Sequence, residues 1–167
     1  NVGAPIELID ILQEAENIKG VLNIPLPGQE GGHAAADVLT GRAQPGGRLT
    51  ATWAKHYEDY PSAENYGYLN GNLETEEYRE GIYVGYRYFD SFDIEPLFPF
   101  GYGISYTTFS IEFEKLQRTE RGMDIIVSVK NTGISYSGRE VVQVYVTPPQ
   151  SDTAKEYQRL AGFAKTG

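Results

Sequence analysis

The chain of 167 residues contains no cysteine, which excludes disulfide bridges and thiolate metal sites. It also has no run of 18 or more apolar residues, so the sequence predicts no membrane-spanning helix. Basic residues are in the minority, with 14 Lys and Arg against 23 Asp and Glu. The resulting formal charge of -9 repels phosphate backbones and anionic lipids, so we expect neither nucleic acid nor membranes as partners.

The first residues also lack the basic and then apolar pattern of a signal peptide. Absence of cysteine is compatible with the cytoplasm and with an exported protein that is stabilised by its core alone. The sequence therefore does not identify the cellular compartment of the protein. The length and the 40% apolar content are sufficient for a packed core.

The first part of the chain has the pattern of an α/β fold. Pro5 and the apolar residues after it indicate a helix start, and the apolar run 18–26 has the length of a buried parallel strand. A glycine-rich turn at 28–32 leads into a helical pattern over 33–39, which Gly41 ends. Residues 46–53 then read as a turn and a short strand, and 54–80 as a long loop rich in tyrosine.

After Thr107 the hydrophobic period changes to two, which is typical of half-buried strands. Apolar residues alternate over 123–129 and again over 142–146, with turn residues between the two runs. We therefore predict an α/β fold followed by an all-β part. The expected domains are residues 1–106, which include the aromatic loop 54–80, and residues 107–167.

Aromatic residues and glycines are concentrated between residues 78 and 109. Their side chains can stack on the faces of sugars or be buried as packing anchors, and burial dominates the energetics of aromatic residues. We favour packing for the four aromatic residues at the centre of this stretch, which are Tyr83, Tyr86, Tyr88 and Phe89.

Glu30 lies in the glycine-rich turn after a predicted strand, where ligands of α/β proteins often bind. The alternative is that its charge stabilises the positive end of the following helix. His33 and His56 have no second ligand at metal-binding spacing, so we predict surface roles for both and expect no metal or cofactor. Three further carboxylates stand close together in sequence without any geometry that places them across a sugar ring: Glu77, Glu80 and Asp90.

Several segments resemble, in order and spacing, family 3 glycoside hydrolases of the β-glucosidase type. They are PLPGQEGGHAAADVLTG, PGGRLTATW, YREGIYVGYRYFD and EPLFPFGYGISYTTF. The resemblance implies that residues 1–106 are the C-terminal half of the family's α/β sandwich domain. It also implies that residues 107–167 begin a fibronectin-III-like β-sandwich, which VSVKNTG, SGREVVQVYV and EYQRLAGFAKTG resemble.

In that family a barrel domain supplies an Asp nucleophile, and the α/β sandwich supplies a Glu acid/base, for retaining hydrolysis of terminal β-linked glucosyl residues. The resemblance places both carboxylates before Asn1, so we expect no catalytic residue in this chain and assign no substrate-binding residue. The chain is then scaffold, with a possible rim of the aglycone site, and needs the barrel and the remaining sandwich segments as partners. The alternative is a non-catalytic module that binds carbohydrate or protein.

Overall fold

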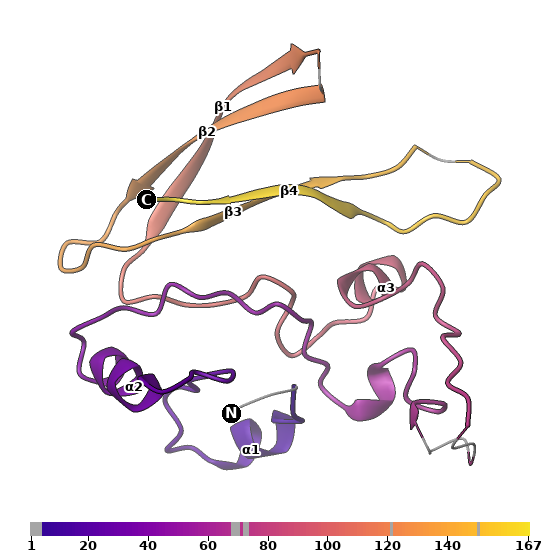
Figure 1. Ribbon diagram of the computed structural model, residues 1–167, viewed down its shortest axis with the longest axis horizontal. Coiled ribbons are helices and arrows are strands. Elements are labelled where there is room, and N and C mark those ends of the chain that lie inside the picture. The colour runs from indigo at the N-terminus through magenta and orange to yellow at the C-terminus, as the bar shows by residue number, and fades with distance from the viewer. Residues whose placement is uncertain (1–4, 68–70, 72–73, 121, 150) are drawn as a thin grey trace. The chain divides into compact units, whose positions relative to one another are not determined.

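The computed structural model describes residues 5–67, 71, 74–120, 122–149 and 151–167 (Figure 1). Both helices and strands are present, as the sequence predicts. The helical elements come first: α1 (Ile9–Glu14), α2 (Gly31–Leu39), the 3-10 helix η1 (Tyr57–Asp59) and α3 (Tyr86–Ser91). Four strands follow: β1 (Phe109–Thr119), β2 (Gly122–Asn131), β3 (Val141–Val146) and β4 (Arg159–Lys165). Each helix in the described ranges is too short or too polar to cross a membrane.

The chain forms two compact units, and each is assembled from segments that are far apart in sequence. The first unit comprises residues 1–28, 48–102 and 145–161, and the second comprises 29–47, 103–144 and 162–167. Strands β3 and β4 each begin in one unit and end in the other. The domain boundary at residue 107 stays a prediction from the sequence.

The first unit contains the buried apolar side chains of the described chain, which are Leu8, Trp53, Ala54 and Phe89. Trp53 makes an antiparallel bridge with Phe98, with its N–H donating to the Phe98 carbonyl at 2.8 Å. The two rings also meet edge to face, 6.2 Å apart. No strand forms over the predicted segment 46–53, which instead has this bridge and backbone hydrogen bonds that join Leu49 to residues 101–102 and Trp53 to Leu97.

The second unit is built around the long antiparallel hairpin of β1 and β2 (Figure 1). On β1 the alternation of apolar residues is interrupted after Phe113, because the next apolar residue, Leu116, lies three positions later. A shift in register between Phe113 and Lys115 compensates, because the extra residue of a bulge returns the next apolar side chain to the original face. Leu116 then pairs with Ile125, and Phe113 with Val127, so the apolar residues share one face.

Strands β3 and β4 form a second two-stranded sheet. The predicted strand over 142–146 is confirmed as β3, and Pro148 and Pro149 follow its end, where they cannot donate to a ladder. The alternating run 123–129 is confirmed within β2.

The buried strand predicted over 18–26 is wrong. This segment has no regular secondary structure, and Ile18, Val21 and Leu26 are exposed. An apolar run becomes a buried strand only when neighbouring strands pair with it on both sides. The described part of the chain supplies no such neighbour for this run.

Candidate functional site

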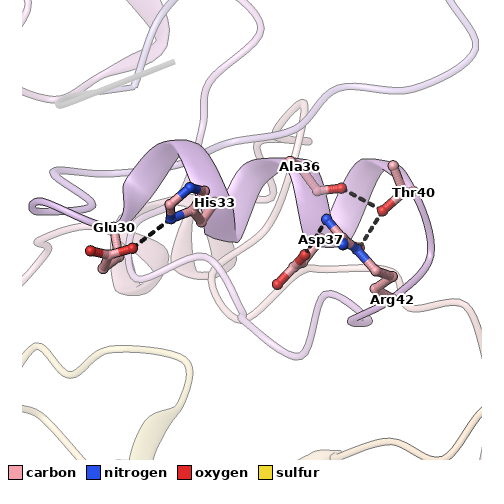
Figure 2. Close-up of polar contacts among 6 residues, drawn as sticks. All are labelled: Glu30, His33, Ala36, Asp37, Thr40 and Arg42. Carbon is pink, nitrogen blue, oxygen red and sulfur yellow. Dashed lines mark hydrogen bonds and ion pairs between the residues drawn. The ribbon is translucent and has the colours of Figure 1, made fainter.

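Helix α2 carries Glu30 and His33, the first of the predicted site residues. Three consecutive alanines at 34–36 have the highest helix propensity, which explains why the helix forms here. It ends where the Thr40 hydroxyl donates to the Ala36 carbonyl at 2.7 Å and Gly41 adopts a φ of 75° (Figure 2). A glycine with positive φ after the last turn is a common helix stop, and the sequence predicted it.

Glu30 and His33 form a surface ion pair at the N-terminus of α2 (Figure 2). The Glu30 carboxylate lies 2.6 Å from Nδ1 of His33, and the two side chains are 81% and 88% exposed. The other carboxylate of this helix, Asp37, is paired with Arg42 at 2.8 Å. Asp37 lies seven positions after Glu30, a helical rise of about 10 Å, which exceeds the roughly 5 to 5.5 Å that retaining hydrolysis requires.

His56 is placed in a contact that the sequence did not predict. Its Nδ1 lies 3.1 Å from one Glu7 carboxylate oxygen, while the other oxygen accepts the Tyr57 backbone N–H at 2.9 Å. The hydrogen bond with His56 lowers the pKa of Glu7, and the same bond raises the pKa of His56. Because 49 positions separate the two residues, no local pattern could reveal the pair.

The remaining predicted carboxylates lie in different surroundings. Glu77 accepts two hydrogen bonds from Arg79, at 2.6 and 2.8 Å, and Asp90 accepts one from the Gln158 amide at 2.8 Å. Glu80 keeps one buried oxygen that has no hydrogen-bond partner in the described chain. These contacts do not assemble two facing carboxylates around a common space.

The aromatic residues around α3 pack against one another. Phe89 is 2% exposed and meets Tyr60 and Tyr88 edge to face. Tyr86 stacks on Phe100, with ring centroids 5.2 Å apart, and its hydroxyl accepts the Leu160 N–H at 2.8 Å. These contacts agree with the packing interpretation of the stretch.

Glu156 is a buried carboxylate that the sequence reasoning missed. It pairs with Arg159, and this hydrogen bond lowers the pKa of Glu156. The next residue, Tyr157, is tied to α3 because its N–H donates to the Ser91 hydroxyl at 2.9 Å. Asp90 and Tyr86 accept two further hydrogen bonds, so three hydrogen bonds join α3 to residues 157–160. Glu156 therefore lies next to a segment that is packed on α3, which favours a structural role for its carboxylate.

The described residues contain no group of three or more His, Cys, Asp or Glu side chains that could hold a metal ion. The polar side chains that could take part in chemistry lie in separate contacts: Glu30 with His33, Glu7 with His56, Glu77 with Arg79, and Glu156 with Arg159. Within the described ranges, these contacts bring no two of the predicted carboxylates together.

Residues 1–86 match the model of the Glycosyl hydrolase family 3 C-terminal domain. The chain is 40% identical to a thermostable β-glucosidase B of Acetivibrio thermocellus over 98% of its length, and 45% identical to a β-glucosidase of Ruminococcus albus over 83%. The structure matches β-glucosidase 3B of Thermotoga neapolitana, solved in complex with glucose, with a TM-score of 0.87 and 40% identity over the whole chain. The chain belongs to glycosyl hydrolase family 3.

The match covers only part of each relative. The chain spans 21% of the Acetivibrio protein, 14% of the Ruminococcus protein and 23% of the Thermotoga chain. The family resemblance inferred from the sequence motifs is confirmed, and so is the glycosidase class of its relatives.

Proposed function

We propose that this chain is the C-terminal scaffold of a β-glucosidase-type enzyme that removes terminal β-linked glucosyl residues with retention of configuration. The observation that carries the proposal is the match to β-glucosidases along 98 to 100% of the chain, through both compact units. A resemblance limited to one unit would support the fold of that unit alone. A match through both supports a shared architecture of the complete proteins.

Retaining hydrolysis needs one carboxylate to attack the anomeric carbon and a second to protonate the leaving oxygen. The candidate carboxylates of this chain are unsuited to these roles, because Glu30 is exposed beside His33 and Glu77 is occupied by Arg79. We therefore propose that other segments of the complete enzyme supply both catalytic groups. The β-glucoside or oligosaccharide substrate would then meet this chain only at the rim of the aglycone site.

The test is hydrolysis of p-nitrophenyl β-glucoside by the complete polypeptide that contains these residues, compared with the isolated 167-residue chain. The complete protein should be active and the isolated chain inactive. Glu30→Gln and Glu77→Gln should each keep kcat within about twofold, because neither carboxylate is proposed to touch the reacting atoms. A loss of 100-fold or more in either variant, with the fold intact, would overturn the scaffold assignment.

We also propose that residues 107–167 begin a fibronectin-III-like β-sandwich. Two sheets support this: the antiparallel β1–β2 hairpin with one apolar face, and the two-stranded β3–β4 sheet that follows it. A sandwich covers such a face with a second sheet. Slower amide exchange of β1 and β2 in the complete protein than in the isolated chain would support the sandwich, and equal exchange rates would contradict it.

A second candidate function is carbohydrate binding without catalysis, and the exposure of tyrosines in the first unit favours it. Tyr66 and Tyr78 present most of their surface to solvent, and an exposed aromatic ring can stack on a sugar face. Saturable binding of cellobiose by the isolated chain, lost in Tyr66→Ala or Tyr78→Ala, would favour this function over the scaffold role.

A further inference from the structure

We propose that a pocket in the second unit binds an oxyanion, such as the carboxylate or phosphate group of a small polar molecule. The pocket has a volume of about 540 Å³. Its lining side chains are Gln44, Ser137, Arg139 and Lys165, with glycine backbone from residues 46, 47, 138 and 167 between them. This proposal is independent of the glycosidase assignment.

The charge of the lining contrasts with that of the chain. The whole sequence carries a formal charge of -9, yet no Asp or Glu side chain lines the pocket. Its two ionic side chains, Arg139 and Lys165, are both cations. Two cations that face one space repel each other, and an anion between them removes that repulsion. The local charge therefore selects a negative ligand.

The two cations are held near each other by two hydrogen bonds between the residues that follow them. The Thr166 N–H donates to the Glu140 carbonyl at 2.9 Å, and the Glu140 N–H donates to the Thr166 hydroxyl at 2.9 Å. Arg139 and Lys165 each lie one residue before a member of this pair. Their convergence is thus a consequence of chain pairing, and it does not depend on flexible side chains meeting by chance.

Hydrogen-bond donors remain available at both cations. The Lys165 ammonium uses one of its three donors on the Gly46 carbonyl, at 2.8 Å. Arg139 has no hydrogen-bond or ion-pair partner among the residues that the structure describes, so its five N–H groups can serve a ligand. A guanidinium presents paired N–H groups that match carboxylate and phosphate oxygens.

Gln44 supplies a further donor, oriented by its neighbour. Its side-chain oxygen accepts the Ser105 hydroxyl at 2.5 Å, which leaves the two N–H groups of the amide nitrogen as donors. That nitrogen lies against Gly138, where an added Cβ would come within 1.9 Å of it. A side chain at position 138 would therefore displace the Gln44 amide from its present position. The three donor groups together match a ligand with several negatively charged oxygens.

The experiment is a calorimetric titration of the complete polypeptide with inorganic phosphate and, separately, with glucuronate. Glucose is the uncharged control. We expect saturable binding of at least one anion at a single site, and none of glucose in the same range. Preference between phosphate and glucuronate identifies which oxyanion the pocket suits. Absence of saturable binding for both anions, or equal binding of glucose, would overturn the proposal.

Matched variants distinguish anion binding in the pocket from nonspecific attraction of anions by positive charge. Arg139→Gln and Lys165→Gln should each weaken anion binding at least tenfold, while Arg118→Gln removes the same charge from the exposed hairpin and should change it less than twofold. Gly138→Ala alters no charge but displaces Gln44, so it should also weaken binding; Gly20→Ala, at an open position, is its control. Equal effects of the three charge variants would show diffuse attraction and contradict a site.

Discussion

The two compact units differ in how much of their apolar surface is buried. The first unit encloses Trp53, whose ring meets Phe98, and Phe89, whose ring meets Tyr60 and Tyr88. In the second unit, Phe113 on β1 is 68% exposed and Met123 on β2 is 67% exposed, although their alternation is that of a core-facing strand. The alternating pattern of β1 and β2 therefore leaves an uncovered face in the second unit, whereas the core of the first unit is built from side chains that follow no such pattern.

The second unit instead relies on polar contacts at the base of its hairpin. The Asn131 side-chain oxygen accepts the Thr107 hydroxyl at 2.6 Å and the Gly133 N–H at 3.0 Å, and its amide donates to the Tyr136 carbonyl at 2.8 Å. A buried threonine and a single asparagine thus fix the chain on both sides of β2. The contrast teaches that apolar burial organises one unit and side-chain hydrogen bonds the other.

Phe89→Ala should have the largest effect, because it empties the centre of the first unit. Truncating a buried Phe typically costs about 3 to 5 kcal/mol. Amide hydrogen exchange should show this loss in residues of the first unit, with little change in β1 and β2. Phe92→Ala, an exposed aromatic on the same segment, is the control and should cost much less. Equal losses for the two variants would break the comparison between buried and exposed rings.

Asn131→Ala should have the next largest effect, confined to the second unit. It removes three hydrogen bonds worth about 1 kcal/mol each, so we expect a loss of about 2 to 3 kcal/mol. Asn131→Asp keeps the accepting oxygen and loses the amide donor, and it should retain part of the stability. Exchange rates of the β2 amides provide the measurement. An unchanged hairpin in Asn131→Ala would show that these bonds do not organise the unit.

The Glu7 and His56 pair should give the first unit a smaller, pH-dependent contribution. The lowered pKa of Glu7 adds stability that is lost as pH falls, and the raised pKa of His56 adds stability that is lost as pH rises through its folded value. The contribution is therefore largest between the ordinary values of 4.5 and 6.5. Thermal unfolding between pH 4 and 8 should show a maximum that flattens in Glu7→Gln, and an unaltered profile in that variant would refute the pair's role.

Phe113→Thr should have the smallest effect on the 167-residue chain. An exposed side chain contributes little to folding, so we expect the unfolding free energy to change by less than about 0.5 kcal/mol. Both residues favour strands, so the hairpin should remain. A loss of about 2 kcal/mol or more would mean that another segment covers this face, and it would end the contrast between the units.

The sequence predicted local structure where the signal is local. Gly41 stopped α2 as expected, and the alternation over 123–129 became one face of β2. The packing of Phe89 followed from the general tendency of aromatic residues to be buried. The apolar run 18–26 failed because a strand needs partners that a run of hydrophobic residues cannot guarantee.

Site geometry was less accessible to sequence reasoning. Glu77 and Glu80 looked alike as loop carboxylates, but one is paired with Arg79 and the other has a buried oxygen without a partner in the described chain. Likewise, nothing near Glu156 in sequence signalled its burial or the docking of Tyr157 on Ser91, 66 residues away. Contacts at such separations depend on the path of the whole chain.

The sequence by itself determined the family, the helical pattern over 33–39 and the apolar alternation of β2, because these depend on the order and local spacing of residues. Only the tertiary structure decided that Glu7 meets His56, and that Arg139 and Lys165 converge on one pocket. Propensity and periodicity act over a few residues, whereas these meetings join segments that are 26 to 49 positions apart. Such convergence is set by the folded chain.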